Sequence, residues 1–171
     1  MILATVGGGG DGVPLLRLFL KALDEVKDVS ALVVTGPLMS RADREELQRL
    51  AQPLQSRVVI QDFVKDMPSY MRAADLVVSM GGYNTVAEII AQRCPALIIP
   101  RNWRYGEFAV GTQAGTEGEQ LLRAQLLKRM GLADYLHPDH LDAAHLAEKI
   151  RTALNGRRTV QEPQWDLNGL P

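Results

Sequence analysis

The feature that most constrains the fold is a regular alternation of short, unbroken apolar runs with longer segments of helical spacing. The short runs are rich in β-branched residues and do not alternate with polar ones. They are residues 2–6, 31–34, 58–60, 76–78 and 96–99. Such runs are typical of strands in a parallel sheet that helices cover on both faces.

Between and after these runs, apolar residues recur every three or four positions, so that each set lies on one stripe of a helix. The sets are Leu16, Phe19, Leu20 and Leu23; Leu47, Leu50, Ala51 and Leu54; Leu122, Leu126 and Met130; and Ala143, Ala147, Ile150 and Leu154. Strands alternating with helices predict an α/β fold, a Rossmann-like, doubly wound parallel sheet in three α/β/α layers.

Composition excludes several classes of protein. The 171 residues suit one compact domain, and 19 basic against 20 acidic residues argue against nucleic-acid binding through bulk charge. No apolar run approaches the roughly 20 residues that span a bilayer. The single cysteine, Cys94, excludes an internal disulfide and suits a reducing compartment. We therefore expect a cytoplasmic protein, at the inner face of a membrane if it contacts lipid peripherally.

In such a sheet, ligands bind beyond the carboxyl ends of the strands. The first loop there is glycine-rich, and Gly8, Gly9 and Gly10 would let the backbone approach a phosphate at the next helix start. A dinucleotide site also needs an acidic residue at the end of the second strand, and residues 34–37 contain none. The loop therefore favours a phosphate but not NAD; a tight turn without a ligand is the alternative.

A second loop follows the fourth predicted strand and opens a helix. Gly81 and Gly82 again allow close approach, and Asn84 and Thr85 would face an anion at the positive helix end. The Glu88 carboxylate, one turn on, could accept two hydrogen bonds from a ribose diol. The alternative is a capping box, in which Thr85 caps the helix and Glu88 bonds back to the backbone.

A third group follows the fifth predicted strand. Arg101 could neutralise a diphosphate, and Glu119 with Gln120 could hydrogen-bond a sugar. A solvated arginine and an ordinary acidic helix start are the alternative. The histidines at 137, 140 and 145 complete no recognised ligand pattern, so no metal site is expected.

Four motifs, in order, resemble the C-terminal domain of glycosyltransferase family 28, the MurG-like group with a GT-B fold. They are the passage from Phe63 to Ser79, the helix start from Gly81 to Ile89, the segment from Pro95 to Pro100, and the segment from Glu119 to Ala124. The likeness covers roughly residues 3–155. It implies the C-terminal half of a GT-B fold, which binds a nucleotide-sugar donor, commonly UDP-linked, without a metal or other cofactor.

The resemblance also implies roles for residues at matching positions. The backbone at Val64 would pair with the base, and Glu88 would hold the ribose hydroxyls. The first glycine loop, with Gly82, Asn84 and Thr85, would line the diphosphate. Glu119 and Gln120 would meet the donor sugar.

The resemblance finally implies a division of labour. Residues 1–156 would form the donor-binding domain, and residues 157–171 a tail that is extended or packs toward an N-terminal acceptor domain. That absent domain would supply the catalytic base, so this chain alone would be inactive. The alternatives are a natural single-domain subunit of a two-part transferase, a non-catalytic nucleotide-binding module, or part of a sugar-nucleotide 2-epimerase.

Overall fold

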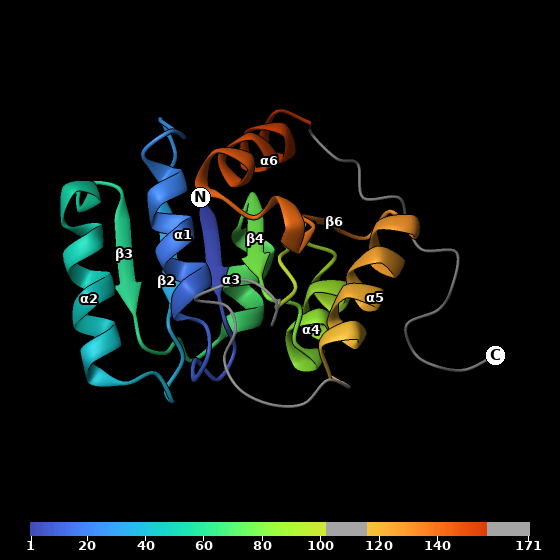
Figure 1. The fold of residues 1–171 in the computed structure, drawn as a ribbon, viewed down its shortest axis with the longest axis horizontal. Coiled ribbons are helices and arrows are strands. Elements are labelled where there is room, and N and C mark those ends of the chain that lie inside the picture. Colours follow the sequence, from blue (N-terminus) through green and yellow to red (C-terminus); the bar gives the residue numbers. More distant parts are fainter. Residues whose placement is uncertain (102–115, 157–171) are drawn as a thin grey trace.

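A computed structural model describes residues 1–101 and 116–156, and within them the chain forms a six-stranded sheet with the order β3-β2-β1-β4-β5-β6. All neighbouring strands pair in parallel. The strands are β1 (Ile2–Thr5), β2 (Ala31–Val34), β3 (Val58–Gln61), β4 (Leu76–Ser79), β5 (Ala96–Ile98) and β6 (Asp134–Tyr135). This order confirms the predicted doubly wound Rossmann-like sheet (Figure 1).

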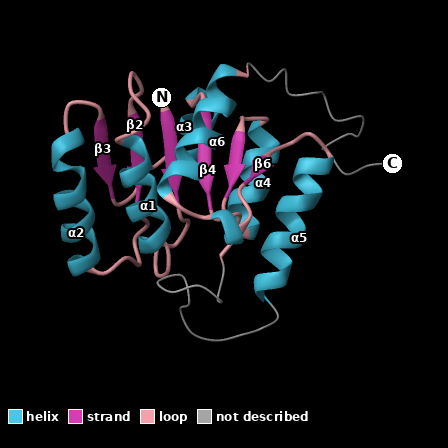
Figure 2. Cartoon of the chain, turned by 45° about the horizontal axis from the view of Figure 1, so that its top comes forward, coloured by secondary structure: helices cyan, strands magenta, loops and turns pink. Residues whose placement is uncertain are grey.

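The helices alternate with the strands as the apolar spacing predicts. They are α1 (Val13–Leu23), α2 (Arg41–Ala51), α3 (Met67–Ala73), α4 (Tyr83–Gln92), α5 (Thr116–Arg129) and α6 (Ala143–Asn155), with short 3-10 turns η1 (Gln52–Leu54) and η3 (Pro138–His140). Figures 1 and 2 show α2 beside β3 at one end of the sheet and α5 beside β6 at the other.

Two apolar layers fill the space between the sheet and its helices. On one face, Ile2 and Ala4 of β1 pack in a cluster with buried residues of α1, α2 and α6. On the other, Leu3 packs with buried residues of α3, α4 and α5. Because successive strand residues point to opposite faces, an unbroken apolar strand supplies both layers. The three-layer architecture is therefore confirmed.

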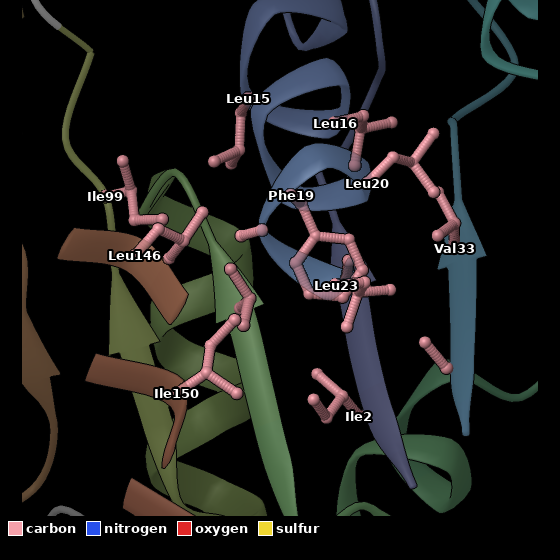
Figure 3. Close-up of a cluster of buried hydrophobic side chains, with 14 of the residues drawn as sticks. Ile2, Leu15, Leu16, Phe19, Leu20, Leu23, Val33, Ile99, Leu146 and Ile150 are labelled. Carbon is pink, nitrogen blue, oxygen red and sulfur yellow. The ribbon is translucent and has the colours of Figure 1, made fainter. Parts of the chain in front are cut away.

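Phe19 lies at the centre of the first layer and is fully buried. Figure 3 shows its ring between the strands that carry Ile2 and Val33 and the α6 residues Leu146 and Ile150. This packing holds α1 and α6 firmly against the sheet, and α1 is the helix whose start borders the first glycine loop.

One expected stripe faces the other way. Leu122 and Leu126 of α5 are 66% and 48% exposed, and Met130, just after the helix, is 39% exposed. The buried side of α5 is formed instead by Ala124 and Leu127, which pack in the second apolar layer. Among the described residues of α5, the buried face has only these two apolar residues, fewer than the exposed stripe, so it is harder to recognise from the spacing of the sequence.

The predicted domain boundary falls where the described part of the chain ends. Helix α6 ends at Asn155, and the expected tail, residues 157–171, lies outside the described residues. The division into domain and tail therefore stays a prediction. No helix in the described ranges is long and apolar enough to cross a membrane.

Candidate functional site

The site lies where the order of the strands reverses. Strands β1 and β4 are neighbours at the middle of the sheet, and the helices that follow them, α1 and α4, pack on opposite faces. Their loops therefore diverge and leave a crevice at the carboxyl edge. A cavity of about 290 Å³ occupies it. The lining residues are Val6, Gly7, Gly8, Asp11, Ser79, Met80, Gly82, Tyr83, Asn84, Thr85, Arg101 and Gln120.

The two helices that begin at this cavity lack the caps that other helices of the chain have. Helices α2, α3 and α6 are capped by the side chains of Ser40, Asp66 and Asp142. Helices α1 and α4 begin after Gly12 and Gly82, with no side-chain cap and no acidic residue in the first turn. Two uncompensated positive helix ends therefore meet at the cavity, as an anion site requires.

The first glycine loop is shaped by contact with the loop after β2. Gly9 has φ +95°, and a Cβ on it would lie 2.2 Å from the Thr35 carbonyl oxygen. Gly36 has φ +84°, and a Cβ on it would lie 2.3 Å from the carbonyl oxygen of Gly7. Neither position has room for a side chain, so the conformation of this loop requires glycine at both positions. Gly8 lines the cavity, whereas Gly10 lies in open space outside the lining.

The observed start of α4, after the second loop, excludes the capping-box alternative for Glu88. Helix α4 starts at Tyr83 with Gly82 as its N-cap, so Thr85 lies inside the first turn and cannot be the cap. Gly82, Asn84 and Thr85 all line the cavity. Gly81, outside the lining, has φ +75°, and its Cβ position is filled by the side chain of Ile98.

Arg101 is held from both sides of the crevice rather than solvated. Its backbone N–H donates to Gln120 Oε1 of α5 at 3.0 Å, and its guanidinium forms an ion pair with Asp11 of the first loop. The Arg101 and Asp11 side chains are only 28% and 26% exposed. The predicted cation therefore does reach the cavity, but it already has an anionic partner there.

Glu119 lies outside the cavity lining and is bound within α5. Its Oε1 accepts a hydrogen bond from Arg123 Nη2 at 2.5 Å. Arg123 also donates to the Gly81 carbonyl oxygen at 3.1 Å and lies over the ring of Tyr83, 5.7 Å from its centroid. This arginine therefore ties α5 to the start of α4.

Two other predicted residues stand near the cavity without lining it. Val64 is buried in the second apolar layer, which fixes the backbone of the loop between β3 and α3. Glu88 is half-buried on α4, and no described residue forms a hydrogen bond or ion pair with its carboxylate. Their predicted roles toward a base and a ribose stay predictions.

Sequence reasoning missed Asp11, Tyr83 and Arg123. Asp11 carried a usable signal, since it is an acid placed among glycines in a loop expected to hold an anion. Tyr83 was visible as an aromatic residue at a helix start, and it is 76% exposed. Arg123 follows Glu119 by four residues, the spacing of a helical ion pair, but its reach to Gly81 depends on the packing of α5.

Two further features lie apart from this site. A larger hollow of about 540 Å³ beside edge strand β3 contains none of the predicted residues. Within residues 1–101 and 116–156, no group of three or more His, Cys, Asp or Glu side chains could hold a metal ion.

The fold is that of the C-terminal, Rossmann-like half of a GT-B fold. Among solved structures, MurG of Acinetobacter baumannii superposes with a TM-score of 0.70 at 19% identity, over 91% of this chain and 41% of that chain. The glycosyltransferase VinC, solved in complex with dTDP, superposes with a TM-score of 0.60 at 20% identity, over 91% of this chain and 33% of that one.

The family follows from sequence. The model of the glycosyltransferase family 28 C-terminal domain matches residues 3–166, so the chain belongs to this family. A relative from Bacillus cereus is 32% identical over 91% of this chain and 40% of its own length. One from Alkaliphilus oremlandii is 25% identical over 94% of this chain and 41% of its own length. Both are named UDP-N-acetylglucosamine–N-acetylmuramyl-(pentapeptide) pyrophosphoryl-undecaprenol N-acetylglucosamine transferases. The chain thus spans about two fifths of the length of these two relatives.

Proposed function

We propose that this chain binds the diphosphate of a nucleotide-sugar donor, UDP-linked, in the cavity between the starts of α1 and α4. It would serve as the donor-binding part of a glycosyltransferase that transfers a hexose or an N-acetylhexosamine. The observation that carries the proposal is the pair of uncapped helix starts that converge on this one cavity. Each supplies roughly half a positive charge and unpaired N–H groups, the recognition chemistry of a diphosphate.

The surrounding residues support a nucleotide sugar over a dinucleotide. Asn84 and Thr85 place polar side chains in the cavity, and Gln120 borders it from α5. The end of β2 carries no acidic residue of its own, whereas a dinucleotide site has one there, and Gly36 at this strand end packs directly against the first glycine loop. UDP as the nucleotide is supported by the relatives, which are named as transferases that use UDP-N-acetylglucosamine.

Transfer itself would need a second part. The described residues nearest the cavity offer the Asp11 carboxylate, which is paired with Arg101, and no histidine. An acceptor domain or a separate acceptor subunit would supply the acceptor and the base that activates it. No metal or other cofactor is required in this proposal, since the helix ends and Arg101 would stabilise the departing diphosphate.

A calorimetric titration with UDP, UDP-N-acetylglucosamine, dTDP, GDP and NAD tests the proposal. UDP and its sugar conjugate should bind at one site, more tightly than the other nucleotides, and NAD should not bind. Thr85→Val keeps the size of the side chain but removes its hydroxyl, and it should weaken UDP binding. Absence of binding by every nucleotide, or preference for NAD, would overturn the proposal.

An assay of sugar transfer separates a transferase part from a non-catalytic module. The chain alone should bind the donor without transferring its sugar. Adding the acceptor domain of a relative, or expressing the chain joined to one, should restore transfer. Binding that never leads to transfer in any such combination would favour the non-catalytic module.

A further inference from the structure

The cavity contains an acidic side chain that an anion site should exclude. Of the described residues that line it, Asp11 and Arg101 are the charged ones, and they form an ion pair with each other. Their formal charges cancel. A diphosphate that entered beside this pair would therefore meet a carboxylate as well as the guanidinium, and the carboxylate would repel it.

Asp11 stands where it can act as an internal anion. It directly precedes Gly12, the N-cap of α1, so it belongs to the turn from which that helix starts. It is also in contact with Arg101. The start of α1 and Arg101 are two of the positive features that a diphosphate in the cavity would use. The carboxylate thus already holds the position at Arg101 that a diphosphate would take.

Arg101 is fixed at its backbone but has donors to spare at its guanidinium. Gln120 accepts the backbone N–H at 3.0 Å, which anchors the residue to α5. The buried Arg101 Nε has no hydrogen-bond partner among the described residues. A guanidinium carries five N–H donors in a rigid fork, and a phosphate can engage more of them than this one carboxylate does. A phosphate can therefore replace the carboxylate as the partner of this guanidinium.

Resting on the proposed function, we infer that Asp11 is a built-in competitor of the diphosphate. A nucleoside diphosphate binds by displacing the Asp11 carboxylate from Arg101, and Asp11 sets how tightly the site holds it. Nothing lies within 4 Å of the position that a Cβ on the neighbouring Gly10 would take, so there is free space on that side of the loop. A tight grip on the product diphosphate would slow its release, and an internal anion of this kind limits that grip.

The test compares binding of UDP and of inorganic pyrophosphate to four variants by calorimetry at low ionic strength. Asp11→Asn keeps the shape of the side chain and removes its charge, and it should bind both ligands at least about tenfold more tightly than the unsubstituted chain. Arg101→Gln should bind both more weakly. In the double variant, Asp11→Asn should bring a clearly smaller gain than it does alone, because only the relief of repulsion remains once the guanidinium is removed.

Glu46→Gln is the matched control. Glu46 forms an ion pair with Arg17, at 2.9 Å, whose side chains are 34% and 22% exposed, much like those of the Asp11–Arg101 pair. It joins α2 to α1 away from the cavity, so its neutralisation should leave both affinities unchanged. A general effect of removing one negative charge would show in this control too.

The outcomes separate this inference from the function on which it rests. If the unsubstituted chain binds UDP and Asp11→Asn binds it no more tightly, the inference is wrong and the proposed function stands. The same holds if Asp11→Asn binds more weakly, which would make Asp11 a ligand-binding group. If no variant, Asp11→Asn included, binds UDP or pyrophosphate, both are overturned.

Discussion

At the residue scale, the structure removes one competing explanation for Glu88, the capping box. Its carboxylate sits in the second turn of α4, half-buried, and the helix begins too early for it to complete a capping box. No described residue forms a hydrogen bond or ion pair with it. A carboxylate that caps nothing at this place is available for the ribose hydroxyls that the family resemblance assigns to it.

Substituting Glu88 therefore separates binding from stability. Glu88→Ala should weaken UDP binding at least about tenfold, because a charge-assisted hydrogen bond contributes roughly 1.5–3 kcal/mol. The melting temperature should stay close to that of the unsubstituted chain, since the change removes no cap or ion pair. Calorimetry and thermal unfolding measure the two effects. Glu148→Ala, an exposed acid of α6, is the control. Full affinity in Glu88→Ala would refute the ribose role.

At the scale of an element, α5 divides its leucines between the core and the surface. Leu127 is 4% exposed and packs in the second apolar layer, whereas Leu122 is 66% exposed. Leu127→Ala should lower the free energy of unfolding by about 2–5 kcal/mol, as expected for a buried leucine. Leu122→Ala should change it by less than about 0.5 kcal/mol. Urea unfolding of both variants measures these changes. An equal loss of unfolding free energy in the two variants would show that the buried face of α5 is assigned wrongly.

Asp134 of β6 joins elements on both sides of the sheet. Its carboxylate forms ion pairs with Lys128 of α5 at 3.1 Å and with Lys149 of α6 at 3.2 Å. Burial raises the pKa of this carboxyl, but the hydrogen bonds from the Tyr135 N–H and from the two lysines outweigh burial, so the pKa is lowered overall. The charged form is thus the one that holds α5, β6 and α6 together.

This lowered pKa fixes the direction of a pH effect. The unfolded chain has the ordinary aspartate pKa of about 3.9, so the stabilisation is complete above that value and is lost as the pH falls through the lower folded pKa. Asp134→Asn should lower the free energy of unfolding by about 1–3 kcal/mol at pH 7. The difference from the unsubstituted chain should shrink below about pH 4. A difference that is independent of pH in urea titrations would show that Asp134 acts through packing alone.

At the scale of the whole molecule, the sheet and its layers could be predicted because they follow from local pattern. Unbroken apolar runs at residues 2–6 and 76–78 require cover on both faces, and right-handed crossovers then determine the topology. The places where chain segments leave the sheet were predictable for the same reason. Gly82, Thr85, Arg101 and Gln120 all line one cavity at that edge.

Long-range contacts could not be predicted in this way. The partnership of Asp11 with Arg101 joins residues 90 positions apart, and the fit of Gly9 against Gly36 depends on how two loops meet. The start of α4 at Tyr83, rather than after Thr85, depends on the turn that Gly81 makes against Ile98. The spacing of residues in the sequence could not predict these three contacts, because it carries no information about what packs beside a loop.

A crystal structure of the chain grown with excess UDP tests the proposed donor site most directly. The diphosphate should lie in the cavity between the starts of α1 and α4, within hydrogen-bond distance of backbone N–H groups at Asn84 or Thr85, and near Arg101. The ribose should lie toward Glu88. If that cavity stays empty at saturating UDP, or if the nucleotide binds elsewhere, for example in the hollow beside β3, the donor-binding assignment is contradicted.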